Sequence, residues 1–588
     1  MPRLRGEFWQ YSAQKTGDLR TKFGEFIQRV RQKLHCDARL RGFYQVGERQ
    51  KGRCEIGMLT DTGSQRVERL RQAVGAEIGL GLEIERGSLH GGTISAAAVL
   101  DNCGEGLPYV EVIMIRLAFA LALLSATPSH AQNLQRKVEA ALAEAPRGTR
   151  FGFVVADDKG REIVAVNPDG RFMPASNTKI FTTAAAYWML PGIDRPDATG
   201  GAAVRMEGQD VVLQGNGDAR LSSTPDCMTD CLSGLADAVA KRTRTVRNVI
   251  GDDTALPDQR WSPGMSWNNI PGWSGTGVSA LTLDDNELRL KVSPGPAGRQ
   301  PVMEMLPYYQ IENRAVTVAS GPTTISYDRD LNGKLLRVTG QIAATAPPRT
   351  LRLGLDDPAH YAAWRLKTLL EARGVRVTGQ VTARHRAMTP MDDPVVRTGA
   401  LPVRAPVLPV LAKLTPAPLT GDVATTNKTS QNLHAELLLR RIGLQTGSGS
   451  IADGQARVAA MLTMAGVPRT AYDFSDGSGM STYNRIAPRG TVTFLGWAAA
   501  QPWGGAWRAT LPVGGVDGTL TRRFKGTALE GRLFAKTGTL NATSALSGYL
   551  VAQSGRTLRF SLIANDIPQD GDVSRVMEAA LLVVAQGS

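Results

Sequence analysis

The segment that organises this chain is residues 174–188, which read PASNTKIFTTAAAYW. The pattern predicts a loop that turns into an apolar helix, with Ser176 and Lys179 near its start. Because three residues are close to one helical turn, the Ser176 hydroxyl and the Lys179 amine would lie on one face, within contact range. That geometry suits a serine nucleophile that is activated by a lysine base.

A simpler explanation stays open for this motif taken alone. Ser-x-x-Lys is common by chance, and a serine at a helix start often just caps the helix. The chain contains a second copy at Ser12 and Lys15, which runs directly into Lys15-Thr16-Gly17. A catalytic role for Ser176 therefore needs support from elsewhere in the chain.

The bulk composition is that of an ordinary globular protein. The 588 residues are 42% hydrophobic and 21% charged, with enough length for about three or four domains. The net charge of +14 comes from scattered Lys and Arg, without a basic run or interleaved aromatic residues. This distribution gives no support to nucleic-acid binding.

Residues 114–131 have the features of a secretory signal peptide. Residues 114–116 read MIR, an apolar run follows at 117–124, and 129–131 read SHA, a small-x-small cleavage pattern. The apolar run is shorter than the roughly 20 residues that span a bilayer, and a buried helix is the alternative. We therefore expect export to the periplasm and no transmembrane segment in the mature chain.

The position of this signal is unusual, because 113 residues without an export feature precede it. We expect translation to begin at Met114, so that residues 1–113 are a leader created by a misassigned start site. A genuine cytoplasmic extension is the alternative. The sequence does not decide whether residues 1–113 are translated.

Cysteine usage agrees with export. Only Cys227 and Cys231 remain after the predicted signal peptide, and an even pair in an oxidising compartment suggests a disulfide. Half of a metal site is the alternative, but no second cysteine pair follows and the histidines of the mature chain are scattered. We therefore predict a disulfide and no metal.

The two ends of the mature chain predict one antiparallel sheet flanked by helices, an α/β (α+β) fold. Strands are expected at 149–156 and 163–166, as a hairpin, and again at 533–540, 545–551 and 558–564, before a closing helix at 573–585. Between these ends, residues 196–400 are rich in Gly, Pro and short alternating strands, so we expect a β-rich insert of one or two subdomains. Helical spacing returns at 431–443 and 451–465.

Two further triplets follow Ser176 and Lys179 in chain order. Ser430-Gln431-Asn432 lies at the mouth of a predicted helix, and Lys536-Thr537-Gly538-Thr539 lies inside a predicted strand of the final sheet. Each triplet is weak alone, since Ser266-Trp267-Asn268 matches the first of them equally well. The order of the motifs and their structural settings together are much more specific.

The full set resembles the penicillin-binding protein and serine β-lactamase superfamily. It is most similar to the low-molecular-mass class C penicillin-binding proteins, which are D-alanyl-D-alanine carboxypeptidases and DD-endopeptidases. The long insert and three blocks carry this resemblance: GTGVSALTLDDN at 275–286, DGSGMSTYNR at 476–485 and LPVGGVDGTL at 511–520. It covers residues 132–588 and implies a transpeptidase-like catalytic domain formed by 132–195 plus 401–588.

The resemblance also implies roles for the motif residues. Ser176 would form an acyl-enzyme, Lys179 would act as its base, Ser430 would relay a proton, and Asn432 would hold Lys179 and the substrate amide. Substrate would also contact the lysine strand and, in this analogy, an acid of the insert: Lys536, Thr537, Gly538, Thr539 and Asp253. A solvated turn aspartate is the alternative for Asp253.

The chemistry of these residues can be argued directly. A lysine serves as a base only when it is neutral, and burial together with a second cation, Lys536, would lower the pKa of Lys179. Lys536 and the threonine hydroxyls suit a terminal carboxylate, and Gly538 would let the substrate backbone lie against the strand. The backbone amides of Ser176 and Thr539 would form the oxyanion hole.

We therefore predict a serine-type D-Ala-D-Ala carboxypeptidase that acts on peptidoglycan stem peptides, binds penicillin and is inhibited by β-lactams. One alternative is a β-lactamase, which is weakened by the long insert and the absence of a Glu-x-x-Leu-Asn motif. Another is a non-catalytic peptidoglycan-binding protein of the same fold. No Gly-x-Ser-x-Gly, His-Glu-x-x-His or Gly-Lys-Ser/Thr motif calls for other chemistry, and no cofactor is expected. The sequence does not rank carboxypeptidase against endopeptidase activity, and it leaves stem-peptide specificity, oligomeric state and peripheral membrane association open.

Overall fold

The computed structural model describes residues 130–401 and 408–588, which all belong to the second of the chain's two units, Met114–Ser588. The predicted leader and signal peptide lie outside these residues, except that His130 and Ala131 begin helix α4 (His130–Ala143). Within the described ranges, no helix is long and apolar enough to cross a membrane.

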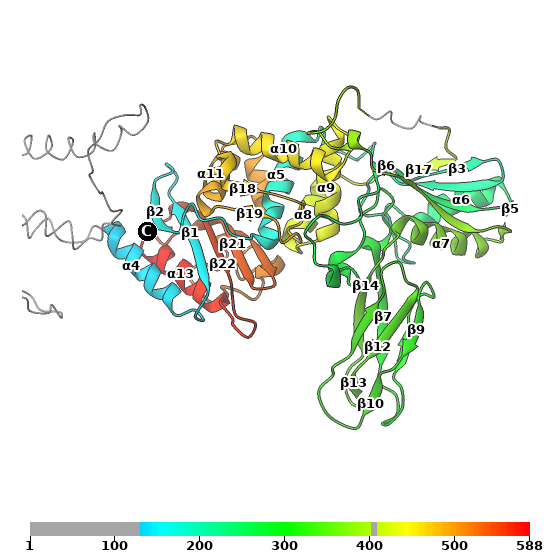
Figure 1. Ribbon diagram of the computed structural model, residues 1–588, viewed down its shortest axis with the longest axis horizontal. Helices are drawn as coiled ribbons and strands as arrows, with labels where there is room; N and C mark the ends of the chain where they lie inside the picture. The colour runs from blue at the N-terminus through cyan, green and yellow to red at the C-terminus, as the bar shows by residue number, and fades with distance from the viewer. Residues whose placement is uncertain (1–129, 402–407) are drawn as a thin grey trace, which may run out of the picture. The chain divides into compact units, whose positions relative to one another are not determined.

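A five-stranded antiparallel sheet joins the two ends of the described chain, in the strand order β2-β1-β22-β21-β20 (Figure 1). Its strands are β1 (Arg150–Ala156), β2 (Glu162–Val166), β20 (Leu533–Leu540), β21 (Thr543–Val551) and β22 (Thr557–Asn565). β1 pairs with β22 along its whole length, and β1 and β2 form a hairpin. The predicted sheet built from both ends is therefore confirmed.

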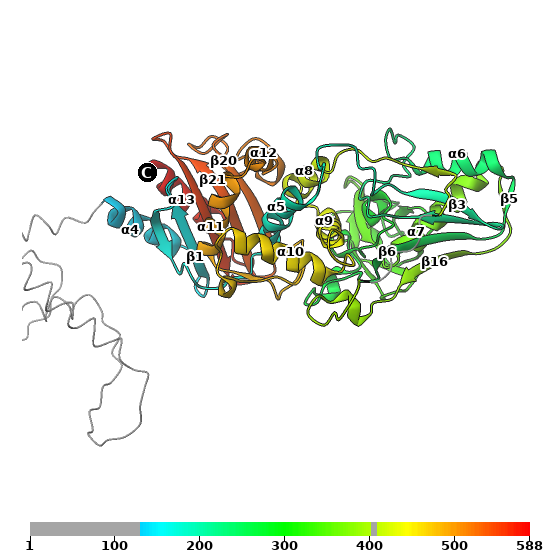
Figure 2. The same ribbon diagram turned by 90° about the horizontal axis from the view of Figure 1, so that it is seen from above.

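Helices cover both faces of this sheet because side chains alternate along each strand. On β1, Phe153 and Val155 share a core with α4 and α13 (Ser574–Gln586), whereas Val154 packs against Val492 of α11 (Pro488–Ala499). The second face also carries a helical layer (Figures 1 and 2), made of α5 (Lys179–Met189), α8 (Thr420–Lys428), α9 (Asn432–Leu444), α10 (Ile451–Met464) and α12 (Gly504–Ala509). This layer and the edge strand β20 position the candidate site.

The insert between α5 and α8 contains a second five-stranded sheet, in the order β16-β6-β4-β3-β17. Its strands are β3 (Ala203–Glu207), β4 (Asp210–Gln214), β6 (Val249–Pro257), β16 (Val381–Arg386) and β17 (Ala412–Lys413). The last strand comes from beyond residue 400 and pairs with β3. Helices α6 (Leu232–Arg242) and α7 (Pro358–Glu371) share the apolar core of this sheet.

The rest of the insert is a module of short strands in three small sheets. It comprises β7 (Glu287–Ser293), β8 (Val302–Glu304), β9 (Gln310–Asn313), β10 (Val316–Val318), β11 (Ser326–Arg329), β12 (Leu335–Thr339), β13 (Gln341–Ala343) and β14 (Arg349–Gly354). Outside the insert, β18 (Tyr472–Asp473) pairs with β19 (Arg485–Ile486). Within it, β5 (Thr245–Val246) also pairs with β15 (Arg376–Val377). The predicted β-rich insert is confirmed.

Sequence analysis missed the two insert helices. α7 carried a readable start signal, since Asp357 caps it by accepting a hydrogen bond from the His360 backbone at 2.9 Å and Pro358 occupies its first turn. α6 is only 11 residues long and contains Gly234, which weakens any helical pattern. Frequent Gly and Pro around both helices hid them.

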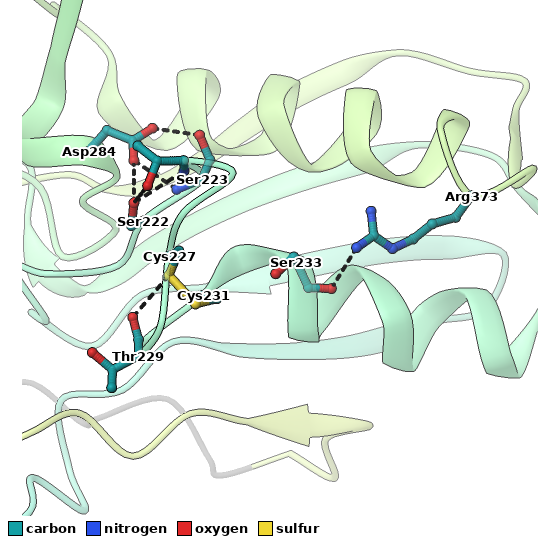
Figure 3. The surroundings of a disulfide bond; sticks show 9 residues. Ser222, Ser223, Cys227, Thr229, Cys231, Ser233, Asp284 and Arg373 are labelled. Atoms are coloured by element: carbon teal, nitrogen blue, oxygen red, sulfur yellow. Dashed lines mark hydrogen bonds between the residues drawn. A yellow bond between two sulfur atoms is a disulfide. The ribbon is translucent and has the colours of Figure 1, made fainter.

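Cys227 and Cys231 form a disulfide, with their sulfurs 2.06 Å apart, in the loop that leads into α6 (Figure 3). The same loop is tied to the block at 275–286, because Asp284 accepts hydrogen bonds from the hydroxyls of Ser222 and Ser223 at 3.0 and 2.6 Å. The bridge thus lies in the insert, where Cys231 occupies the position directly before α6.

Candidate active site

Ser176 and Lys179 lie where a 3₁₀ turn, η1 (Ala175–Thr178), runs into α5. The Lys179 Nζ atom is 2.9 Å from the Ser176 Oγ atom, and the lysine side chain is fully buried. Ala175, directly before the serine, has a left-handed φ of 47°, a conformation that is costly for a residue with a Cβ. The predicted contact between hydroxyl and amine is present, and a strained backbone holds it.

Two carbonyl oxygens also contact Lys179. Its Nζ atom lies 2.6 Å from the side-chain oxygen of Asn432 and 2.6 Å from the backbone oxygen of Ser478. The amide nitrogen of Asn432 donates to the Ser274 carbonyl at 2.8 Å, which fixes the orientation of the amide. The insert therefore helps to hold the amide that contacts Lys179.

Burial lowers the pKa of Lys179 to about 7, against the opposing attraction of Asp476 and Glu436. Sequence analysis expected a depressed lysine but did not anticipate either carboxylate. At neutral pH a large fraction of Lys179 is consequently uncharged. Such an amine is available to accept a proton.

Ser430 and Lys536 form a second pair of the same kind. The Lys536 Nζ atom is 2.8 Å from the Ser430 Oγ atom and donates to the Thr537 carbonyl, also at 2.8 Å. Ser430 has a left-handed φ of 60° immediately before helix α9. Burial and the repulsion from Lys179 hold the pKa of Lys536 well below its usual range.

Strand β20 forms the edge of the sheet, and the side chain of Lys536 on this strand contacts Ser430. The Ala535 N–H points outward, since it donates to Pro512 O at 2.9 Å, and peptide groups alternate along a strand. Thr537 and Thr539 must therefore present their peptide groups at the same edge. The Thr537 hydroxyl lies 2.7 Å from that of Thr519, in the block at 511–520.

Gly538 meets a demand that sequence analysis did not anticipate. A Cβ atom at this position would lie 2.6 Å from Pro174 O and 3.1 Å from Asn177 N. Glycine is thus required by the close approach of the turn that carries Ser176.

Asp253 lies in an ion-pair network inside the insert. It is 5% exposed and accepts hydrogen bonds from the Ser279 hydroxyl at 2.8 Å and from His385 Nδ1 at 3.0 Å. Asp253 and Asp357 together raise the pKa of His385 to about 10, although burial opposes this charge. The structure does not bring Asp253 together with the two serines and two lysines.

Sequence analysis also missed a buried histidine beside Asn432. His434 Nε2 lies 3.0 Å from Asp285 and its Nδ1 lies 2.9 Å from Asp422. Burial opposes a charge on the ring, yet these two carboxylates raise the pKa of His434 to about 9. Asp285 belongs to a left-handed turn, with φ values of 51°, 57° and 50° over Asp284, Asp285 and Asn286, so a strained segment of the insert holds the start of α9.

The competing Ser-x-Asn triplet has no such setting. Ser266 is only partly buried, and its hydroxyl contacts Asn268 at 2.6 Å. The competing Ser-x-x-Lys pair, Ser12 and Lys15, lies outside the described residues. Among the candidates that the structure describes, Ser176 and Ser430 are the serines in contact with buried lysines.

Two serine–lysine pairs beside the edge strand of an antiparallel sheet define the serine acyl-transfer class to which penicillin-binding proteins belong. The chain belongs to the D-Ala-D-Ala carboxypeptidase 3 (S13) family, whose model matches residues 134–587. It is 33% identical to a D-alanyl-D-alanine carboxypeptidase of Actinomadura sp. (strain R39) over 499 residues, which cover 81% of this chain and 87% of that protein.

Other relatives agree with this assignment. The D-alanyl-D-alanine carboxypeptidase DacB of Haemophilus influenzae is 24% identical over 74% of this chain and 90% of that protein. The crystal structure of penicillin binding protein 4 (dacB) from H. influenzae matches the fold with a TM-score of 0.63 and 20% identity, over 76% of this chain and 97% of that chain. A second structure of that protein, complexed with a β-lactam, matches with a TM-score of 0.59 and 19% identity, over 76% of this chain and 98% of that chain.

Proposed function

We propose that this protein hydrolyses the terminal D-Ala-D-Ala bond of peptidoglycan stem peptides through an acyl-enzyme on Ser176. Its family membership supports the carboxypeptidase activity, and the alternatives, a β-lactamase or a non-catalytic binding protein, are not favoured. The same serine would be acylated by penicillin and other β-lactams.

The observation that carries this proposal is the set of contacts around Lys179 Nζ. A neutral amine has two N–H groups and one lone pair, and the oxygens of Asn432 and Ser478 are acceptors only. They take the two N–H groups, so the lone pair faces the third neighbour, the Ser176 hydroxyl at 2.9 Å. This is the arrangement that a general base needs in order to take the serine proton.

Each step then has a group to perform it. As Lys179 takes the proton, Ser176 Oγ bonds to the carbonyl carbon, and the backbone amides of Ser176 and Thr539 stabilise the oxyanion. As the C–N bond breaks, Ser430, hydrogen-bonded to Lys536, passes a proton to the nitrogen of the departing D-alanine. The proton that Lys179 took from Ser176 replaces the one that Ser430 gives up, so Lys179 is neutral again. Water then attacks the ester carbon, its proton goes to Ser176 Oγ by way of Lys179 as the C–O bond breaks, and its hydroxyl stays on the product acid.

Substrate binding would rest on the edge of β20. Lys536, with Thr537 and Thr539, would hold the carboxylate of the terminal D-alanine. The substrate backbone would pair with the outward peptide groups of the strand, as an added strand does. Asp253 is not assigned to this contact set, because its hydrogen bonds are with Ser279 and His385 inside the insert.

We further propose that the protein works in the periplasm and that residues 114–131 are its signal peptide, with residues 1–113 outside the mature protein. The disulfide between Cys227 and Cys231 supports an oxidising compartment. Mass spectrometry of the N-terminus of the exported protein tests this. A peptide from residues 1–113 on that protein would refute it.

The decisive experiment is labelling with a fluorescent penicillin, followed by peptide mapping and a D-alanine release assay. We expect label on Ser176 alone, and neither label nor release in Ser176→Ala. Ser430→Ala should slow acylation, whereas the matched control Ser266→Ala should not. Label at another residue, or rapid hydrolysis of the penicillin, would contradict the proposal.

A further inference from the structure

The loop that supplies the Ser478 carbonyl lies directly behind Lys179. Besides that contact at 2.6 Å, the Gly477 carbonyl accepts a hydrogen bond from the Thr182 hydroxyl at 2.8 Å. Gly479 has a φ of +88°, and a Cβ there would lie 1.9 Å from Ala175 O. The loop is therefore fitted against both the base and the turn that carries the nucleophile.

Glu436 holds this loop from helix α9, about one turn after Asn432. Its Oε1 atom accepts hydrogen bonds from the backbone N–H groups of Gly477 at 3.0 Å and Ser478 at 2.8 Å. Its Oε2 atom accepts one from Arg440 at 2.8 Å. The carboxylate is 6% exposed, so these partners replace nearly all of its water.

Asp476 holds the loop from within. It is 2% exposed and accepts hydrogen bonds from the backbone N–H groups of Gly479 at 2.8 Å and Ser481 at 2.6 Å, and from the Asn484 amide at 2.6 Å. Four backbone N–H groups of one short loop thus end on two buried carboxylates. On the other side of the loop, the Ser478 and Gly477 carbonyls accept hydrogen bonds from Lys179 and Thr182 of α5.

The peptide group between Ser478 and Gly479 connects Asp476 to Lys179. Its N–H donates to the carboxylate, and its C=O accepts from the Lys179 amine. Hydrogen bonds in such a chain polarise one another, so a carboxylate at one end makes the carbonyl at the other a stronger acceptor. The Ser478 oxygen is therefore both fixed in direction and strengthened.

We propose that Asp476 and Glu436 are positioning residues that set the orientation and the basicity of Lys179 through the Ser478 carbonyl. This inference rests on the proposed role of Lys179 as the base. Neither carboxylate touches the reacting atoms. Their effect is to direct the amine's lone pair at Ser176 and to offset part of the burial that disfavours its charge.

The charges around Lys179 predict the direction in which the pH dependence of acylation should shift. Lys536 faces it from β20, Glu436 from α9 and Asp476 from the loop, and Arg440 pairs with Glu436. Asp476 and Glu436 raise the pKa of Lys179 against burial. Because the active base is the neutral amine, removing either negative charge must move the acidic limb of the pH–rate profile to lower pH. Burial and the neighbouring Glu436 raise the pKa of Asp476 to about 6, so the charge of Asp476 acts from about that pH upwards.

The test is the pH dependence of the second-order rate of penicillin acylation, measured on the full protein between about pH 5 and 9. Glu436→Gln keeps the acceptor for Gly477 and Ser478 but removes the charge and the hydrogen bond from Arg440. Asp476→Asn removes the charge and one hydrogen bond. We expect the acidic limb to move down by about half a pH unit or more in each variant. Glu139→Gln, the same change on an exposed site of α4, should leave the limb in place.

The outcomes separate this inference from the function on which it rests. If both variants fold, as judged by their thermal unfolding midpoints, and the limb does not move, the inference is wrong although Lys179 remains the base. Either folded variant with the expected shift supports it. Failure of both variants to fold would overturn it in favour of a purely structural role. The proposed role of Lys179 as the base fails separately, if Lys179→Met acylates at the wild-type rate in the same assay.

Discussion

Lys179 and Lys536 occupy two pockets that look alike and differ in charge. Each lysine is fully buried, and each contacts one serine hydroxyl and one backbone carbonyl. Asp476 and Glu436 raise the pKa of Lys179 and so oppose the effect of burial. At Lys536, burial and the repulsion from Lys179 both lower the pKa. Within residues 130–401 and 408–588, Lys179 has carboxylates that favour its charge, whereas no carboxylate has this effect on Lys536.

This difference teaches how two identical side chains take different roles. Lys179, with its balance of burial and carboxylates, is tuned to titrate near neutrality, which suits a base. Lys536 would regain a favourable environment for its charge only when an anion arrives. In the proposed reaction the substrate carboxylate is that anion, so substrate completes the second pocket.

The strongest way to break this comparison is to remove the base. Lys179→Met should lower the rate of penicillin acylation by about 10²–10⁴-fold, because the Ser176 hydroxyl loses the group that accepts its proton. The measurement is the rate of fluorescent penicillin incorporation at pH 8. The same variant should unfold at a higher temperature, since a buried amine is replaced by an apolar side chain of similar length.

Removing the second lysine should have a smaller and more selective effect. Lys536→Met should lower kcat/KM for a peptide ending in D-alanine by about 10–100-fold, the range expected for a lost charge-assisted hydrogen bond. A peptide that ends in D-alaninamide lacks the carboxylate and should lose much less. Equal losses on both peptides would mean that Lys536 does not recognise the carboxylate.

His434, two residues after Asn432 on α9, is a third buried cation, and two carboxylates raise its pKa, as another two do for Lys179. Its pKa in the folded protein, about 9, lies above its usual 6.5, so its stabilising charge is fully present below pH 6.5 and is lost as the pH rises through 9. His434→Gln should therefore lower the free energy of unfolding by on the order of 1–3 kcal/mol at pH 6 and by less at pH 9.5. Denaturant unfolding at the two pH values measures this.

A matched control for that variant exists in the insert. Burial and the proximity of Lys334 lower the pKa of His360, so the charge of this histidine disfavours folding. His360→Gln should not show a stability loss that grows towards low pH. The same trend in both variants would assign the effect to histidine loss in general.

The smallest effect on the site is expected from the disulfide. Cys227→Ser with Cys231→Ser opens a loop closed over a sequence separation of 4, which should cost at most about 2 kcal/mol of stability. Acylation should stay within about twofold, because the bridge lies in the insert, among the contacts of α6. A large loss of acylation would show that the insert transmits strain to the lysine pockets.

Much of the fold could be predicted from local patterns. The strand at 533–540 was placed with the bounds of β20, and the helix at 451–465 differs from α10 by one residue, because alternation and helical spacing are local properties. The contact between Ser176 and Lys179 followed from helical geometry for the same reason. The prediction that these motifs share a site needed their order along the chain and the family resemblance.

The residues that sequence analysis missed act across long separations. Glu436 meets the backbone of Ser478, which lies 42 positions away, and His434 meets Asp285 at a separation of 149. A buried carboxylate in an apolar helix and one in a loop look like ordinary polar residues until the fold brings their partners to them. The block at 476–485 was recognised as a family mark, and that was the signal that could have led to Asp476.

The two ends of the described chain meet in one sheet, and this has a consequence for when the active site can form during synthesis. Asn177 and the Lys536 carbonyl are hydrogen-bonded across 359 positions of sequence. At a synthesis rate of roughly 5–20 residues per second, the nucleophile turn waits roughly 20 to 70 seconds for the strand against which it packs. A nascent chain that lacks its last strands therefore has neither the complete sheet nor the pocket of Lys536, so it cannot yet carry both serine–lysine pairs.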